Sequence, residues 1–257
     1  MVKPKSYFFS FIVLLIISVP GVSFSHGNKV SIKIVGDKRC ITSNGTPNHS
    51  IGQFPNKGNP NRFKKQEVKV CVNVLPEKSE KITRLTRGSG ISITGIIFRP
   101  GTADWYDPST SRGFSRNRAS GWNLEGMGPD NALGLDSENA HVDNRGLYHY
   151  HAVSSSLKSS ITGSLIGYAA DGYEIHYIGK QAKSSWRLKS GERPTKPFGD
   201  YDGTYNQDYE YVVGSGNLDE CNGSILGGKY VYFATDNYPF FPRCFIGRVS
   251  RDFIGRP

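Results

Sequence analysis

The sequence predicts a mainly β protein of the β-rich α+β class, folded as a single compact domain with long loops and few short helices. Short segments in which apolar and polar residues alternate recur along the chain, and this period is typical of half-buried strands. Thirty glycines and fourteen prolines punctuate these segments. Few segments keep a helical period over three turns, so the regular structure is expected to be mostly strand.

The first 25 residues have the pattern of a secretory signal peptide. Two lysines precede an almost unbroken apolar run, Tyr7 to Val19, which is too short to span a bilayer comfortably. A proline and a glycine break the run and small residues follow, so we expect cleavage near Ser25. The alternative is an uncleaved anchor. The expected product is a secreted or periplasmic domain, residues 26–257, with no membrane span.

Strands are expected wherever the alternation is clear. The predicted strands are Val30 to Val35, Val68 to Val74, Ile91 to Phe98, Tyr173 to Ile178, Tyr209 to Val213 and Tyr230 to Ala234. Short helices are predicted at Ser154 to Ser160 and around Asp130 to Leu135, and long loops at residues 45–60 and 100–121. Residues 26–87 could form an N-terminal lobe.

Four cysteines, Cys40, Cys71, Cys221 and Cys244, suit an oxidising compartment, where an even number can pair. Three pairings are possible. We favour Cys40 with Cys71 and Cys221 with Cys244, one bridge near each end, each contributing about 3 kcal/mol by restricting the unfolded chain. Four free buried thiols are the alternative. No C-x-x-C spacing occurs, which argues against a thiolate metal site.

The chain is basic, with a formal net charge of +10. Much of this charge lies in two clusters, one formed by Lys57, Arg62, Lys64, Lys65 and Lys69 and the other by Arg112, Arg116 and Arg118. An exported chain without a recognition-helix pattern is not expected to bind nucleic acid. A solvated basic surface, or a surface for an acidic envelope polymer, is the preferred interpretation.

Three of the six histidines, His141, His149 and His151, lie within one short segment. If Tyr148 to His151 is extended, His149 and His151 leave the same face of the strand, and the two tyrosines leave the other. A turn at Asn144 to Gly146 would fold His141 back toward this strand.

Three histidines with an open fourth position form the pattern of a zinc or copper site. A carboxylate such as Asp136 or Asp143 could close the site instead. The alternative is that the histidines are core or hydrogen-bonding residues. A further copper ligand would arise if cleavage exposed His26 as the N-terminus.

From this segment outward the chain resembles the YHYH domain family, named for Tyr148-His149-Tyr150-His151. Matching stretches run from residue 43 to near the C-terminus. They are 43–49, 54–61, 140–142, 169–172, 201–204, 219–223 and 242–244. The resemblance implies an exported protein of a mostly bacterial family and supplies no reaction. Similar proteins tend to have a hydrophobic or aromatic residue near His176, so this histidine is not taken as a ligand.

Carboxylates supply the remaining site predictions. Asp171, Asp219 and Glu220 are candidate general acids or bases beside a bound metal. Acids at alternate positions from Asp200 to Asp208 could hold calcium, although a turn leading into the strand Tyr209 to Val213, with Asp side chains capping loop amides, is the preferred interpretation.

Two classes of function follow, and the sequence does not decide whether the protein is an enzyme. The first is a metal-dependent envelope or extracellular protein, a hydrolase or oxidoreductase, that acts on a small molecule or polysaccharide. The second is a binding or adhesion module that holds carbohydrate or another envelope polymer, with calcium as a structural aid.

Overall fold

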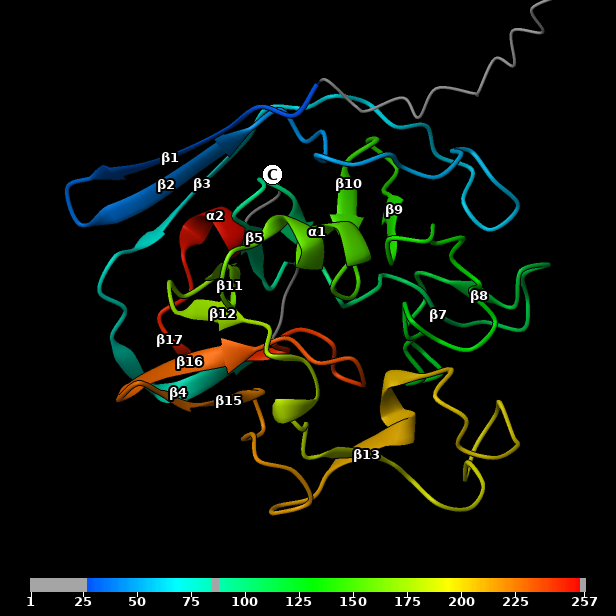
Figure 1. Cartoon of the computed structure of the whole chain (residues 1–257). Coiled ribbons are helices and arrows are strands. Elements are labelled where there is room, and N and C mark those ends of the chain that lie inside the picture. Colours follow the sequence, from blue (N-terminus) through cyan, green and yellow to red (C-terminus); the bar gives the residue numbers. More distant parts are fainter. Residues whose placement is uncertain (1–26, 85–87, 255–257) are drawn as a thin grey trace, which may run out of the picture.

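The computed structural model describes residues 27–84 and 88–254. Most of its regular structure is β-strand, which confirms the predicted fold class (Figure 1). The predicted signal peptide and His26 lie outside the described residues. Within the described part, no helix has the length and apolar character needed to cross a membrane.

An eight-stranded mixed sheet forms the centre of the described structure. In spatial order its strands are β15 (Gly223–Leu226), β16 (Lys229–Phe233), β12 (Glu174–His176), β11 (Leu165–Ala169), β5 (Gly90–Ser92), β6 (Ile97–Phe98), β10 (Tyr148–Tyr150) and β9 (Ala140–Val142). Strand β10 pairs in parallel with β6 and antiparallel with β9. The histidine segment therefore lies at one edge of this sheet.

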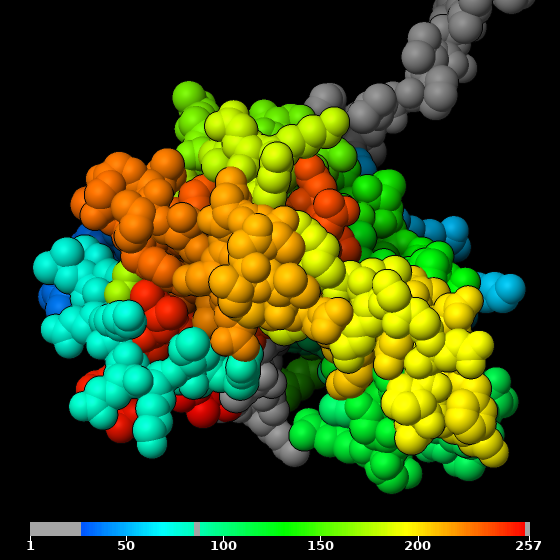
Figure 2. Space-filling model, turned by 90° about the horizontal axis from the view of Figure 1, so that it is seen from below, coloured from blue at the N-terminus to red at the C-terminus, as the bar shows by residue number. Residues whose placement is uncertain are grey.

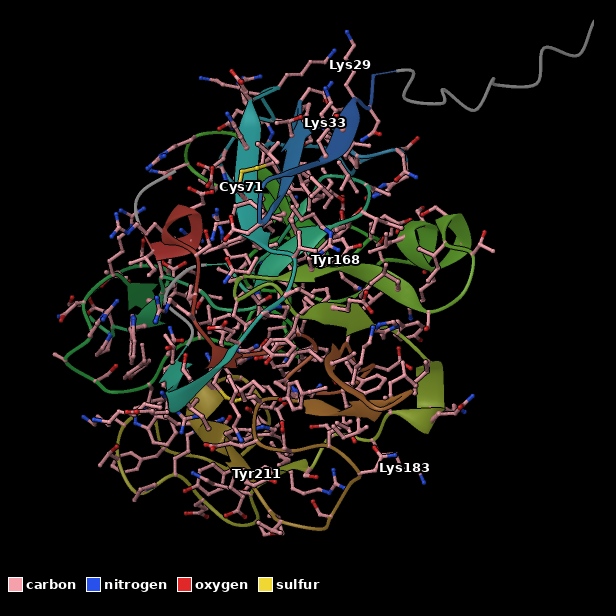
Figure 3. All side chains as sticks on the ribbon, turned by 90° about the vertical axis from the view of Figure 1, so that its left-hand side faces the viewer. Lys29, Lys33, Cys71, Tyr168, Lys183 and Tyr211 are labelled. Carbon is pink, nitrogen blue, oxygen red and sulfur yellow. A yellow bond between two sulfur atoms is a disulfide. The ribbon has the colours of Figure 1, made fainter. Side chains whose placement is uncertain are left out.

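A three-stranded antiparallel sheet precedes the central sheet in the chain. It contains β1 (Val30–Val35), β2 (Lys38–Ser43) and β3 (Val68–Asn73). Cys40 and Cys71 face each other across β2 and β3 and form the first predicted disulfide, visible beside the Cys71 label in Figure 3. Buried side chains of β2 and β3, among them Ile41 and Val70, belong to the same core as the central sheet.

Shorter elements surround these two sheets. Strand β4 (Lys78–Arg84) pairs with β17 (Cys244–Gly247), β7 (Trp105–Tyr106) with β8 (Phe114–Ser115), and β13 (Trp186–Leu188) with β14 (Tyr209–Tyr211). The helices are α1 (Ser155–Ser160), α2 (Arg251–Ile254) and the 3-10 turns η1 (Gly179–Gln181) and η2 (Asn206–Asp208). The second predicted disulfide, Cys221–Cys244, ties the chain before β15 to β17.

The predicted helix around Asp130 to Leu135 is wrong. This segment consists of turns, with Asn131 and Gly134 both at positive φ. Left-handed residues interrupt a helical hydrogen-bond ladder. The predicted helix at Ser154 to Ser160 is confirmed as α1, where the Ser154 hydroxyl caps the first turn by accepting from the amide of Leu157 at 2.8 Å.

Loop segments form a second, smaller packed region. Trp122 and Leu124 bury their side chains against Tyr205, and the indole Nε1 of Trp122 donates to Thr195 Oγ1 at 2.9 Å. Figure 2 shows the yellow segment around residues 190–210 lying against the green surface of the preceding loops. This region anchors the loops that pack beside the histidine segment.

Candidate metal centre

The three histidines of the YHYH segment meet on one face of the β9–β10 hairpin. His141 and His149 are directly opposite each other in the strand pairing. The ring of His151, the residue after β10, lies 4.7 Å from that of His141 and 5.1 Å from that of His149, between centroids. The predicted turn is present: Gly146 has a φ of 90°, and Asp143 accepts hydrogen bonds within it.

The two tyrosines point to the opposite face, as the strand period predicts. The hydroxyl of Tyr148 donates to Asp136 at 2.8 Å, and that of Tyr150 hydrogen-bonds Nε2 of His49 at 2.6 Å. Both phenols are buried in the main core. The tyrosines therefore fix the strand while the histidines are presented on its other side.

The ligand atoms of His141, His149 and His151 all lie within 4.8 Å of one another. The Nε2 atoms of His141 and His151 are 3.2 Å apart. Two nitrogens bound tetrahedrally at about 2.0–2.1 Å from one zinc ion would be separated by about 3.3–3.4 Å. The triad could therefore hold a single metal ion with little rearrangement.

Backbone carbonyls fix the tautomers of two of these rings. Nδ1 of His141 donates to the carbonyl of Leu133 at 2.9 Å, and Nδ1 of His149 donates to that of Leu147 at 3.0 Å. Since a carbonyl oxygen only accepts, both Nδ1 atoms carry the proton and both Nε2 lone pairs are free. This is the outer arrangement that metal-binding histidines normally have.

The third ring, His151, is held differently. Its Nδ1 is buried and makes no hydrogen bond, and the backbone of Gly126 lies against it. The backbone of Pro100 is near enough to raise the pKa of this ring. Because His141 carries its proton on Nδ1, Nε2–H of His151 donates to Nε2 of His141 in the chain without metal.

Burial lowers the pKa of all three imidazoles, and that of His149 and His151 falls well below its ordinary value. Nearby Arg99 lowers all three pKa values further. His141 also lowers the pKa of His149 and His151, and His151 lowers that of His149. The neutral form, which is the one that binds metal, is therefore favoured at neutral pH.

Two arginine–carboxylate pairs flank the triad, and neither was predicted from the sequence. Arg99 Nη1 contacts Asp143 at 2.9 Å, and Arg243 Nη2 contacts the buried Glu125 at 2.7 Å. Burial raises the pKa of Glu125 against the lowering effect of Arg243. Glu125 directly precedes Gly126, and no local pattern in the sequence identifies it, because its partner is far away in the chain.

Asp136 and Asp143, the acids considered for closing the site, are already engaged. Asp136 accepts from Tyr148 and from backbone amides, including that of Gly52, and Asp143 pairs with Arg99. The metal-ligand group formed by the described residues contains the three histidines alone. The predicted histidine set is therefore brought together, with a fourth coordination position that neither acid fills.

The predicted catalytic carboxylates are not brought to the triad. Asp171 accepts from Tyr232 and the amide of Gly247, on the side of the central sheet away from β9 and β10. Asp219 accepts the amides of Cys221 and Gly223 in the turn before β15. Glu220 pairs with Arg84 at 2.6 Å. Each of these carboxylates is engaged in hydrogen bonds or an ion pair that stabilises the structure around it.

The predicted calcium segment surrounds an arginine. The guanidinium of Arg193 contacts Asp208 at 2.7 Å and Asp202 at 2.5 Å. Asp208 also accepts the amides of Gly203 and Tyr205. Arg193 therefore supplies to these two acids the positive charge that the sequence analysis assigned to calcium. His176 is also occupied, since its ring nitrogens meet Ser164 and Glu174.

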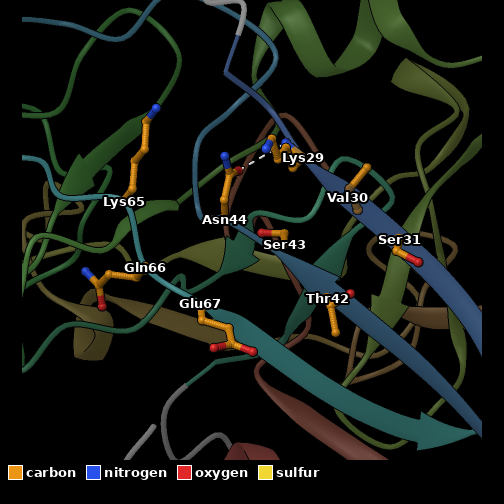
Figure 4. A pocket seen from close by; sticks show the side chains of 9 residues that line it. All are labelled: Lys29, Val30, Ser31, Thr42, Ser43, Asn44, Lys65, Gln66 and Glu67. Carbon is orange, nitrogen blue, oxygen red and sulfur yellow. Dashed lines mark hydrogen bonds between the residues drawn. The ribbon is translucent and has the colours of Figure 1, made fainter.

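Two hollows of the described surface lie elsewhere. One, of about 440 Å³, is on the three-stranded sheet and is lined by Lys29, Val30, Ser31, Thr42, Ser43, Asn44, Lys65, Gln66 and Glu67 (Figure 4). The other, of about 790 Å³, lies between the β1–β2 turn and α2. Neither is lined by a histidine of the triad.

Comparison with known proteins gives one match. Residues 69–247, more than half of the chain, match the family model described as YHYH protein. Searches of curated proteins and of solved structures return no match.

Proposed function

The chain belongs to the YHYH protein family, and from this premise we propose that it is an exported metalloprotein that binds one zinc or copper ion through His141, His149 and His151. The single observation that carries the proposal is the convergence of three imidazoles, of which His149 and His151 are buried and His141 is partly buried. Backbone carbonyls accept from Nδ1 of His141 and His149, which leaves the Nε2 lone pair of each for a metal. Two disulfides support an oxidising compartment.

The donor set favours zinc or copper over calcium or magnesium. Neutral imidazole nitrogen suits zinc and copper, whereas calcium and magnesium prefer oxygen. All four cysteines are paired in disulfides, so no thiolate competes for the ion.

Three protein ligands leave a coordination position for water or substrate, which is the arrangement of catalytic rather than structural zinc sites. A metal held there would act as a Lewis acid, or in the case of copper as a redox centre. The protein's own contribution is to bury the imidazoles, fix their tautomers and limit access, since His141 is the partly exposed ligand and His149 and His151 are buried. We propose a metal-dependent enzyme on this basis.

Elemental analysis of protein purified from its native compartment tests the proposal. We expect close to one zinc or copper per chain, and loss of that metal in the double variant His149→Ala, His151→Ala. His49→Ala is the matched control, because His49 hydrogen-bonds Tyr150 on the opposite face. Full metal content in the folded double variant would remove the proposal.

A second candidate function, binding of an acidic envelope polymer, has one observation in its favour. Arg112 donates to the carbonyl of Gly58 at 3.3 Å, so the loops that carry the two basic clusters are in contact. Polymer retention by the triad double variant, with loss on changing Arg116 and Arg118 together to Gln, would support this role independently of metal.

A further inference from the structure

Strand β1 leaves one edge of the three-stranded sheet open. It pairs with β2 along one side, and no described strand pairs with its other side (Figure 1). Three aliphatic side chains of this strand, Val30, Ile32 and Ile34, are exposed. An edge of this kind presents backbone groups that another extended chain can join.

Hydrogen bonds at Cys71 of β3 fix the direction of the backbone groups in this sheet. Its N–H donates to Asp252 at 2.8 Å and its carbonyl accepts from Ser250 at 2.7 Å, so both groups point away from β2. The facing residue of β2, Cys40, therefore directs its own N–H and carbonyl to β1, where its partner is Lys33. Since the two kinds of pair alternate along an antiparallel ladder, Lys33 belongs to a hydrogen-bonded pair with β2.

The residues on either side of Lys33 consequently direct their N–H and carbonyl groups to the open edge. They are Ile32 and Ile34, and Val30 follows at the same alternation. No described residue donates to or accepts from these groups. The side chains of the same three residues leave one face of the strand. The edge therefore combines a free hydrogen-bond ladder with an aliphatic stripe.

We propose that this edge binds the same edge of a second copy of the chain, with the two β1 strands antiparallel about a two-fold axis at Ile32. In this register Ile32 faces Ile32 of the second copy, and Val30 faces Ile34. The free backbone groups then bond one another, and the aliphatic side chains meet on one face. A shift by one residue would place Ile32 opposite Lys33, whose backbone groups already bond β2.

The charges of the edge also fit a second copy. Lys33 lies opposite Ser31 of the second copy in this register, so the two lysines do not face each other. Asp37 follows the end of β1 in the β1–β2 turn, and its side chain is 82% exposed. The strand end that carries Lys29 of the second copy comes beside this turn, and the two-fold axis repeats the arrangement. The edge is therefore complementary to itself in backbone groups, apolar side chains and charge.

Disulfide trapping tests the register. Facing residues with free backbone groups would have Cα atoms about 5.5 Å apart, within the range of a disulfide. Under mild oxidation we expect Ile32→Cys to form a covalent dimer. Val30→Cys and Ile34→Cys should each remain monomeric alone and should crosslink when mixed, because these positions face each other only between copies. Ser31→Cys, on the opposite face of the strand, is the control that should not crosslink.

Sedimentation of the protein at rising concentration tests the association without a covalent link. β1 has six residues, whereas a standard interface has about 20–30 residues on each side, so we expect a reversible, concentration-dependent dimer. Ile32→Pro removes only an outward N–H, which an edge strand tolerates, and should keep the chain monomeric. Ile34→Asp should do the same. The matched control is Ile225→Asp on β15, an edge strand of the central sheet, because Ile225 is 63% exposed and Ile34 is 57% exposed. This control should dimerise like the wild type.

Several results would overturn the proposed dimer. One is a wild-type protein that is monomeric at every concentration, together with an Ile32→Cys variant that forms no covalent dimer. Another is a dimer that survives in Ile34→Asp and is lost in Ile225→Asp, because it would use the other edge. Ile32→Cys linked only to other proteins of its native compartment would assign the edge to a different partner.

Discussion

The backbone of Gly126 is packed directly against Nδ1 of His151, so closely that a β-carbon at position 126 would overlap the imidazole ring. This contact sets the position of the deepest ligand of the triad. Glycine is required here by space, since the residue does not adopt a positive φ.

Gly126→Ala should therefore displace His151. We expect a loss of metal affinity of about tenfold or more and a fall in unfolding free energy of about 1–3 kcal/mol from overpacking. Chelator competition and urea unfolding measure the two effects. Gly27→Ala is the control, because its new methyl would be in ordinary contact with the flexible side chain of Lys65. Unchanged affinity in Gly126→Ala would show that the ring is free to move.

Changes at Arg243 and Glu125, which form a buried ion pair, should have strongly non-additive effects on the free energy of unfolding. Arg243→Met leaves Glu125 charged without its partner, at 1% side-chain exposure, and we expect a loss of about 3–5 kcal/mol in urea unfolding. Adding Glu125→Gln to that variant should recover part of the loss. Arg84→Met breaks an exposed pair with Glu220 and is expected to cost at most about 1 kcal/mol. Additive effects at Arg243 and Glu125 would contradict this coupling.

The acids of the predicted calcium segment should not depend on calcium for their structure. Because Arg193 lies between Asp202 and Asp208, chelation of calcium is expected to leave the thermal midpoint unchanged. Arg193→Met, by contrast, should destabilise the chain by about 3–5 kcal/mol, since Asp208 is fully buried. A chelator-dependent fall in the midpoint of the wild-type protein would restore the calcium interpretation.

Asp171 should make stability depend on pH. Burial raises the pKa of this carboxyl above its ordinary value of 3.8, against the lowering effect of the Tyr232 and Gly247 hydrogen bonds. Between the unfolded and folded pKa the native chain binds the proton and the unfolded chain does not, so the unfolding free energy falls as pH rises through that interval.

Asp171→Asn replaces the titratable carboxyl with an amide that binds no extra proton, while the amide oxygen can still accept from Tyr232. Relative to wild type, the variant should become progressively more stable as pH rises from about 4 to the raised pKa of the folded chain, by at most about 1.4 kcal/mol per pH unit. Urea unfolding at a series of pH values measures the difference. A difference that is constant with pH would mean that Asp171 binds no extra proton in the native chain.

The local parts of this structure could be predicted from the sequence. The alternation at Val30–Val35 gave β1 with its observed bounds, and the spacing of His149 and His151 placed both rings on one face. The favoured disulfide pairing is confirmed. Each of these features depends on strand periodicity, a short turn or the position of cysteines along the chain.

Long-range features could not be predicted in the same way. Strand β6 lies beside β10 because of sheet topology, and this parallel pairing brings Arg99 to the histidines. Glu125 meets Arg243 across 118 positions of the chain. Asp171, predicted as a general acid or base, precedes the turn-forming Gly172. The sequence alone did not show whether this acid has a structural or a catalytic role.

The short chain distance between the three ligands has a consequence for how the metal is acquired. A loop as short as the β9–β10 turn closes at little entropic cost, and hairpins form in about 1–10 μs, far faster than most long-range strand pairing. The hairpin can thus present its imidazoles to an ion while the rest of the chain is still folding. The metal supply of the compartment where that folding takes place then decides which ion the hairpin meets first.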